Sequence, residues 1–229
     1  MDGEEFMDRK YRGQKTIETI EKIVSDFTAI KRSNNYRDHF FPALIDALNL
    51  KNGVEIGTDV GQFAVQILEK SKIKKLHCID PWIDNFGTDY TGTKLEDKVK
   101  FDKIGENRQA SAIKNLKKFI DNGRCVLCKG TSAEIGQNWS EPIDFLYIDG
   151  DHSLEGIYTD LYLWTEKVRE GGIIAGHDYK DNPNSGMKDY FGNSLPNMVK
   201  TVTDNFCNQY GFKVHPVGML IKSFWFVRT

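Results

Sequence analysis

The stretch that most constrains this chain is VEIGTDVGQF, which runs from Val54 to Phe63. An apolar strand leads into a turn that contains Gly57 and Gly61, and the segment after the turn has the periodicity of a helix. Small residues at such a turn let the backbone pass close to a ligand, to which the new helix offers its N-terminus. The same pattern also occurs in doubly wound α/β proteins for structural reasons alone. It therefore predicts a Rossmann-like α/β fold and makes the turn a candidate binding site.

A carboxylate after the next strand supports the binding interpretation. The strand LHCID ends in Asp80, at the distance from the turn where an acidic side chain can accept hydrogen bonds from both ribose hydroxyls of a nucleoside. A dinucleotide-binding turn has a glycine where this chain has Asp59, and a carboxylate there repels a pyrophosphate. Glu55 adds a second negative charge, which suits a cationic ligand better than a polyphosphate. An NAD(P)-dependent oxidoreductase is therefore kept only as an alternative.

Length and charge exclude several classes of protein. A chain of 229 residues is long enough for one α/β domain with a buried core. Positive and negative groups nearly balance at a net charge of −2, which gives no basic field for nucleic acid. The sequence has no apolar run that could span a membrane, and its charged start lacks the apolar segment of a signal peptide. We therefore expect a cytoplasmic protein without nucleic-acid or membrane partners.

The chain divides into two predicted regions. Residues 1–50 carry apolar side chains at three- and four-residue spacing, which predicts helices that pack on the core. Residues 51–229 are predicted to form the Rossmann-like domain. Within this domain, a helix at residues 62–70 and the strand KLHCID complete the first βαβ unit.

A stretch without regular periodicity follows, from Pro81 to about Gly105. Loops of this length are usually either functional covers or insertions. Trp82 directly follows Asp80, so it either covers the nucleoside or packs beneath a surface insertion. A helix is then predicted over residues 106–122, with a further strand after it.

Polar side chains gather at the ends of two later strands. The segments IDFLYID and IIAGHDY are predicted as strands because they are largely apolar, and the helix between them is predicted to be closed by Gly171 and Gly172. Ligands of open α/β sheets bind at the edge where such strands end. The polar residues at that edge are Asp149, Asp151, His152, His177 and Asp178. They predict a functional cluster, with the alternative that Asp151 and His152 only cap the helix.

Together these motifs resemble the class I S-adenosylmethionine-dependent methyltransferases. The series Glu55, Gly57 and Gly61 is similar to their motif I, E-x-G-x-G-x-G, with Asp59 in place of the middle glycine. The segments IDGDH and GGIIAGHDY resemble the metal-dependent O-methyltransferases that include the macrocin and related sugar O-methyltransferases. The resemblance implies a three-layer sandwich around a seven-stranded, mostly parallel sheet with an antiparallel last strand. The segments GFKVHPVG and MLIKSFWFVRT would supply the terminal hairpin.

The resemblance also implies a metal site and a catalytic base. Asp149, His177 and Asp178 match the positions where the family holds a divalent cation, and His177 replaces an acid there. Magnesium prefers oxygen ligands and manganese accepts an imidazole, so His177 either binds the cation or lies behind its ligands. His152 matches a general base found in some sugar O-methyltransferases, and Asp151 is the competing base.

The implied cofactor is S-adenosylmethionine. In the resemblance, the loop after the strand RCVLCKG meets the adenine, which gives Ser132 and Ala133 a cofactor role, although Ser132 also suits a helix N-cap. The residues expected to line the cofactor pocket are Glu55, Gly57, Asp59, Gly61, Asp80, Trp82, Ser132, Ala133 and Asp149.

We therefore predict a methyltransferase that methylates a hydroxyl on a small polar metabolite or sugar. A bound cation would lower the pKa of that hydroxyl and fix its position. The alternatives are an NAD(P)-dependent oxidoreductase on the same type of sheet and a non-catalytic nucleotide-binding module. The sequence does not identify the acceptor, and it leaves a homo-oligomer open.

Overall fold

The computed structural model describes residues 18–19, 22, 36–83, 95–181, 198–218 and 223–229. Two predicted segments lie mainly outside these residues. One is the first N-terminal helix, of which residues 18, 19 and 22 are described and helical. The other is a loop that the glycine-, asparagine- and proline-rich segment KDNPNSGMKDYFGNSLP predicts at residues 180–196, of which only residues 180 and 181 are described.

Seven strands form one sheet in the order β3-β2-β1-β4-β5-β7-β6. The first five strands run parallel, and β7 runs antiparallel to both β5 and β6. The arrangement confirms the predicted Rossmann-like, mostly parallel sheet with an antiparallel last strand. The strands are β1 (Asn52–Ile56), β2 (Lys75–Asp80), β3 (Cys125–Lys129), β4 (Ile143–Ile148), β5 (Val168–Gly176), β6 (His215–Val217) and β7 (Ser223–Val227).

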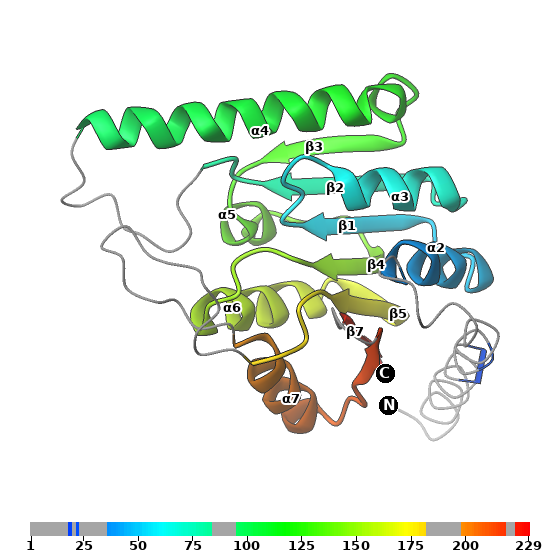
Figure 1. Cartoon of the computed structure of the whole chain (residues 1–229). Helices are drawn as coiled ribbons and strands as arrows, with labels where there is room; N and C mark the ends of the chain where they lie inside the picture. The colour runs from blue at the N-terminus through cyan, green and yellow to red at the C-terminus, as the bar shows by residue number, and fades with distance from the viewer. Residues whose placement is uncertain (1–17, 20–21, 23–35, 84–94, 182–197, 219–222) are drawn as a thin grey trace.

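Helices cover both faces of the sheet and give the predicted three layers (Figure 1). The helices on one face are α2 (Arg37–Ala47), α3 (Gln62–Lys70) and α4 (Leu95–Asp121). Those on the other face are α5 (Ser132–Gln137), α6 (Leu154–Thr165) and α7 (Val199–Tyr210). Central strands buried on both sides explain the apolar runs of the sequence. Within the described residues, no helix has the length and apolar character that crossing a membrane would require.

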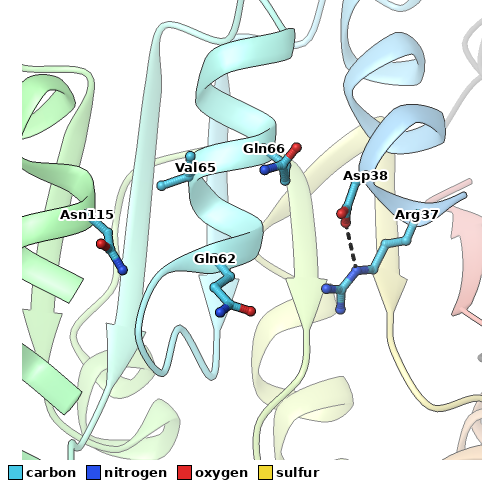
Figure 2. A pocket seen from close by; sticks show the side chains of 6 residues that line it. All are labelled: Arg37, Asp38, Gln62, Val65, Gln66 and Asn115. Atoms are coloured by element: carbon cyan, nitrogen blue, oxygen red, sulfur yellow. Dashed lines mark hydrogen bonds and ion pairs between the residues drawn. The ribbon is translucent and has the colours of Figure 1, made fainter. Parts of the chain in front are cut away.

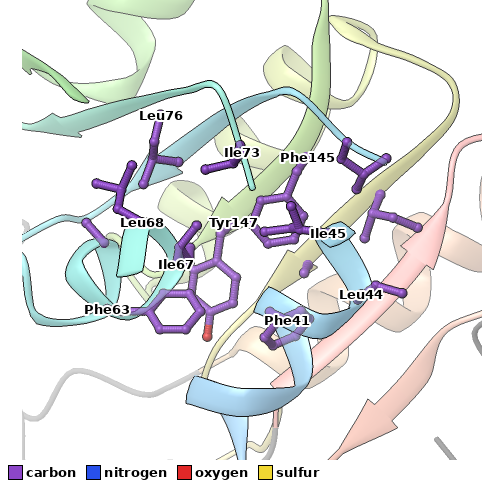
Figure 3. Close-up of a cluster of buried hydrophobic side chains, with 14 of the residues drawn as sticks. Phe41, Leu44, Ile45, Phe63, Ile67, Leu68, Ile73, Leu76, Phe145 and Tyr147 are labelled. Carbon is purple, nitrogen blue, oxygen red and sulfur yellow. The ribbon is translucent and has the colours of Figure 1, made fainter. Parts of the chain in front are cut away.

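An aromatic cluster joins the first helical layer to the centre of the sheet (Figure 3). The ring of Phe63, in the first turn of α3, lies 4.3 Å from that of Tyr147 in β4, and Phe41 of α2 meets Tyr147 edge-on at 5.3 Å. Each buried aromatic side chain of this kind contributes about 2 to 3 kcal/mol. Because Tyr147 lies just before Asp149, the cluster fixes the end of β4 relative to the turn before α3. The division of the chain at residue 50 stays a prediction.

The boundary between α6 and β5 differs from the prediction. Gly171 and Gly172 were expected to close the helix, but α6 ends and β5 begins before them. Gly171 has a φ of 71°, and its N–H donates to the carbonyl of Arg228 at 2.8 Å. The pairing of β5 with β4 also shifts register in this region. The two glycines therefore belong to an irregular part of a strand.

The predicted loop after β2 was too long, because α4 begins at Leu95 and not after Gly105. Gly105 lies inside this helix. A Cβ added there would lie 1.8 Å from the carbonyl oxygen of Trp82, so only glycine allows the two segments to meet. The glycine that looked like the end of a loop is thus a packing residue of the helix.

Candidate functional site

The ends of four parallel strands bring the predicted site residues to one edge of the sheet. The glycine turn follows β1, Asp80 ends β2, Asp149 follows β4, and His177 follows β5. The backbone ties these ends together: the N–H of Asp149 bonds to β1 at 2.8 Å, and that of His177 bonds to β4 at 3.0 Å. This is the edge at which ligands of open α/β sheets bind.

The two glycines of the turn are required by contacts within the chain. Gly57 has a φ of 83°, and a Cβ added to it would lie 2.0 Å from the carbonyl oxygen of Asp149. Gly61, with a φ of 80°, is the N-cap of α3, and its added Cβ would lie 2.8 Å from Leu116. The glycines therefore let the loops after β1 and β4 and helix α4 approach one another. Their role toward a cofactor stays a prediction.

The carboxylate of Asp80 is held in place by the turn. Its oxygens accept the backbone N–H groups of Asp59 at 2.8 Å and of Trp82 at 2.7 Å. Burial raises the pKa of Asp80, and these two hydrogen bonds oppose the rise. The side chain of Trp82 is 2% exposed and donates its indole N–H to the carbonyl of Asp59 at 2.8 Å. Trp82 thus packs on the turn, and Asp80 has a fixed orientation.

Glu55 does not carry the negative charge that the sequence suggested. Its side chain is 2% exposed and accepts the hydroxyl of Thr58 at 2.8 Å. Burial raises the pKa of Glu55 to about 8, so the carboxyl is mostly protonated at neutral pH. The negative charge at this edge therefore comes from Asp59, Asp80 and the carboxylates that follow β4 and β5, and not from Glu55.

Four side chains after β4 and β5 form a compact cluster. The imidazole of His152 lies between two carboxylates, with Nε2 at 3.4 Å from Asp149 and Nδ1 at 3.6 Å from Asp178. The Nδ1 of His177 lies 3.5 Å from Asp149 and 3.6 Å from Asp178. The structure thus brings together residues that the sequence separated by a helix and a strand.

The members of this cluster shift one another's pKa values. Burial opposes the charge of Asp149, but the imidazoles of His152 and His177 outweigh it and hold the pKa of Asp149 well below its usual range. Burial alone would lower the pKa of His152, whereas Asp149 and then Asp178 raise it above its usual value. At 3.4 Å the contact with Asp149 is poorly aligned, and the buried Nε2 of His152 has no hydrogen-bond partner among the described residues.

The N-cap of the helix after β4 is neither Asp151 nor His152. Ser153 is the N-cap of α6, and its hydroxyl oxygen accepts the N–H of Gly156. Asp151 accepts both the N–H and the hydroxyl of Ser153 at 2.9 Å, so it orients the residue that caps the helix. His152 instead faces the cluster. Their catalytic roles stay predictions, but Asp151 is already occupied.

The predicted metal ligands do not fit a metal ion as they are arranged. In the part of the chain that the structure describes, no group of three or more His, Cys, Asp or Glu side chains could hold one. Asp149 is surrounded by the imidazoles of His152 and His177, and its second oxygen lies 3.3 Å from the guanidinium of Arg37. Cationic and imidazole groups therefore take up the carboxylate that would be the central ligand.

The loop after β3 is anchored by α6. Thr131 forms a capping box with Glu134, so Thr131 is the N-cap of α5, which rules out the alternative that Ser132 fills this position. The hydroxyl of Ser132 donates to Asp160, and the indole of Trp164 donates to the carbonyl of Ser132 at 3.2 Å. Ala133 follows as a half-buried residue of α5.

Asp160 is a buried carboxyl that the sequence reasoning missed. It is 2% exposed, and burial raises its pKa to about 7, while the bond from Ser132 opposes the rise. A signal was present: Asp160 lies on the helical face of Ile157, Leu161 and Trp164, where a charged residue is out of place.

Arg37 was also missed, because it lies in the predicted N-terminal helices far from any motif. It is the first residue of α2, and its guanidinium stacks on the ring of Phe63 at 4.4 Å while reaching Asp149. It also borders a cavity of about 340 Å³ between α2, α3 and α4 (Figure 2). The other lining residues are Asp38, Gln62, Val65, Gln66 and Asn115.

A family model described as a methyltransferase domain matches residues 54–179, more than half of the chain. This chain belongs to that methyltransferase family. The matched segment runs from β1 to just beyond β5 and contains the glycine turn, Asp80 and the Asp–His cluster, but not Arg37. The match favours neither an NAD(P)-dependent oxidoreductase nor a non-catalytic nucleotide-binding module.

Similar proteins extend the comparison. An uncharacterized protein of Acanthamoeba polyphaga mimivirus is 29% identical to this methyltransferase over 166 residues, which cover 72% of this chain and 66%, just under two thirds, of the viral protein. An O-methyltransferase from Bacillus cereus in complex with SAH has a TM-score of 0.56 at 14% identity, over 92% of this chain and 90% of its own. A SAH-bound methyltransferase from Podospora anserina has a TM-score of 0.56 at 15% identity, over 100% and 97%. At these identities the structural likeness shows the fold alone.

Proposed function

We propose that this protein is an S-adenosylmethionine-dependent methyltransferase that transfers a methyl group to a hydroxyl oxygen of a small polar molecule, such as a sugar or related metabolite. The observation that carries the proposal is the family match over residues 54–179, which include the glycine turn, Asp80 and the Asp–His cluster. The proteins of similar fold from B. cereus and P. anserina are complexes with SAH, which supports the cofactor. The former is an O-methyltransferase, which supports oxygen as the acceptor atom.

The residues at the sheet edge fit this cofactor. The two oxygens of Asp80 each accept one backbone N–H and keep a second lone pair for a ribose hydroxyl. The loop after β3, with Ser132 and Ala133, is next in the sheet and would meet the base. When bound, the cofactor supplies a methyl group on a positively charged sulfur. The ionised Asp149 favours positive charge at the edge.

We assign the general base to His152. Its buried Nε2 lacks a hydrogen-bond partner among the described residues, and such a group is satisfied when a ligand hydroxyl donates to it. Its Nδ1 faces Asp178, which orients the ring and stabilises the imidazolium. Methyl transfer forms the bond from the acceptor oxygen to the methyl carbon, breaks the bond from that carbon to sulfur and moves the hydroxyl proton to Nε2. Asp151 is the weaker candidate because Ser153 holds both of its oxygens.

The mechanism proposed for His152 does not include divalent-metal assistance. The resemblance to metal-dependent O-methyltransferases motivates a cation at Asp149, His177 and Asp178, but the arrangement of these side chains does not support it. The cytoplasmic location, the lack of nucleic-acid or membrane partners and a homo-oligomeric state are likewise proposals from the sequence.

A methyl-transfer assay tests the proposal. The purified protein is incubated with S-adenosylmethionine labelled at the methyl group and with a panel of sugars and other small hydroxylated molecules, with and without a chelator. We expect label in an acceptor, a loss of at least about 100-fold in His152→Gln, and no loss in His39→Gln, which changes an exposed histidine outside the cluster. Unchanged transfer in His152→Gln would contradict the assignment of His152 as the general base. Transfer that disappears with the chelator and returns with magnesium or manganese would show that the reaction needs a divalent metal ion.

A further inference from the structure

The edge of the sheet contains a cation that the matched family segment does not include. Arg37 comes from α2, 112 residues before Asp149 in sequence, yet its Nη1 lies 3.3 Å from that carboxylate. The guanidinium carbon of Arg37 lies over the ring of Phe63, 4.4 Å from the ring centroid. Burial opposes its charge, but Tyr147, Asp149 and Asp38 raise the pKa of Arg37 above its usual value. The side chain is therefore a fixed positive charge that the helical layer inserts into the site.

The guanidinium keeps hydrogen-bonding capacity. It offers five N–H donors in a rigid fork: the structure directs Nε to Asp38 and Nη1 to Asp149, both at 3.3 Å, and the phenol of Tyr147 is a further neighbour, which leaves donors for a ligand. These distances are long for hydrogen bonds between charged groups, which usually measure about 2.7 to 2.9 Å. The side chain is 26% exposed and borders the cavity in Figure 2, so a ligand can reach it. Arg37 can thus take a further carboxylate in two-pronged contact.

The order of the strands indicates which part of a bound nucleoside ligand would lie beside Arg37. In the sheet, β3, β2, β1 and β4 are successive neighbours. A nucleoside with its ribose on Asp80, at β2, and its base toward the loop after β3 must extend its remaining atoms across β1 toward β4. Arg37 and Asp149 lie at that end. In S-adenosylmethionine those atoms are an amino-acid tail with one carboxylate and one ammonium.

The neighbourhood explains why this carboxylate would need Arg37. The edge is acidic, with Asp59, Asp80 and Asp149 around the turn, and a ligand carboxylate would be repelled without a cation. Arg108 lies 3.2 Å from Asp59, on the ribose side of the turn. Of these two arginines, Arg37 is the one at the β4 side.

We propose that Arg37 is a binding residue for the carboxylate of the cofactor's amino-acid tail, supplied by helix α2 from outside the matched methyltransferase segment. The proposal rests on the proposed function, because it takes S-adenosylmethionine as the cofactor. Arg37 would then be the residue that makes the protein bind the complete cofactor more tightly than a nucleoside without the amino-acid tail.

Calorimetric titration with two ligands tests this assignment. S-adenosylhomocysteine carries the tail, whereas 5′-methylthioadenosine has the same nucleoside and a thioether but no amino acid. We expect the wild-type protein to bind S-adenosylhomocysteine more tightly. In Arg37→Gln, the affinity for S-adenosylhomocysteine falls by about 10- to 100-fold, the range for a lost charged hydrogen bond. The affinity for 5′-methylthioadenosine stays within about twofold, which also reports that the site is folded; Arg37→Lys keeps the charge without the fork and loses less.

Arg169→Gln is the matched control, because Arg169 pairs with Asp144 near the start of β4, at the opposite edge of the sheet. It should change neither affinity. An equal loss for both ligands in Arg37→Gln, no loss for either, or equal wild-type affinity for the two ligands would overturn the inference while leaving the proposed function intact. A wild-type protein that binds neither ligand would overturn the proposed function and this inference with it.

Discussion

Replacing the buried carboxyl of Asp160 should stabilise the protein in a pH-dependent way. Asp160 is 2% exposed inside α6, and burial raises its pKa from 3.8 to about 7 in spite of the hydrogen bond from Ser132. Asparagine has nearly the same shape and keeps an oxygen that can accept the Ser132 hydroxyl, but it does not titrate. Asp160→Asn therefore removes the cost of ionisation and leaves the packing in place.

The sign and size follow from proton linkage. Above pH 4 the unfolded chain loses the proton of Asp160, whereas the folded protein keeps it up to about pH 7. A raised folded-state pKa thus contributes stability that is complete below pH 4 and lost as pH rises through about 7. The loss is about 1.4 kcal/mol for each pH unit between the two pKa values and levels off above pH 7, which gives about 2.6 kcal/mol between pH 5 and pH 8. Relative to the wild type, Asp160→Asn should gain this amount between pH 5 and pH 8.

Urea denaturation at pH 5 and pH 8, followed by tryptophan fluorescence, measures the two free energies of unfolding. The control is Asp144→Asn. Burial opposes the charge of Asp144, but Arg169 and backbone N–H groups outweigh it and lower its pKa, so it is ionised at both pH values and its replacement should cost the same at each. An effect of Asp160→Asn that does not change between pH 5 and pH 8 would refute the reasoning.

Three further changes have defined outcomes. Gly57→Ala places a Cβ 2.0 Å from a backbone oxygen at a φ of 83°, and should lower the free energy of unfolding by more than about 3 kcal/mol, whereas Gly123→Ala, at a φ of 76° with open space around it, should cost about 1 kcal/mol. Thermal denaturation compares the two, and equal losses would contradict the close contact. Phe41→Ala removes a wholly buried ring and should cost about 3 to 5 kcal/mol in urea denaturation; a loss below about 1 kcal/mol would mean that the aromatic cluster does not hold α2. Asp80→Ala should lower the affinity for S-adenosylhomocysteine by about 10-fold or more while the protein stays folded. Unchanged affinity would show that Asp80 is not part of the binding site.

Much of the fold could be predicted because its signals are local. The glycine turn, the acidic end of β2 and the two apolar strands each lie within a few residues, and parallel strands then place their ends on one edge. The cluster of Asp149, His152, His177 and Asp178 was predictable for the same reason. Its members follow β4 and β5, which are neighbours in the sheet.

The differences arise where the role of a residue depends on a distant partner. Gly105 looked like the end of a loop because the carbonyl of Trp82, which requires a glycine there, is far away in sequence. Gly171 looked like a helix end, but it bonds to Arg228 at the far end of the chain. Local patterns describe the residue and not its contact, so these boundaries could not be derived.

The two missed residues differ in kind. Asp160 interrupts the apolar face of α6, so its burial could have been read from the helical period. Arg37 gives no such signal, because an arginine in the first turn of a helix is ordinary. Only the fold brings it to Asp149. The charge of Glu55 was misjudged because burial, which sets its pKa, is not visible in the motif.

The central claim is the class of cofactor, and one titration tests it most directly. The purified, chelator-treated protein is titrated by calorimetry with S-adenosylhomocysteine and, in a separate experiment, with NAD. We expect saturable binding of S-adenosylhomocysteine with one ligand per chain and no heat of binding with NAD. Binding of NAD alone would contradict the interpretation of the turn at Asp59, and binding of neither ligand would leave a methyltransferase fold without its cofactor.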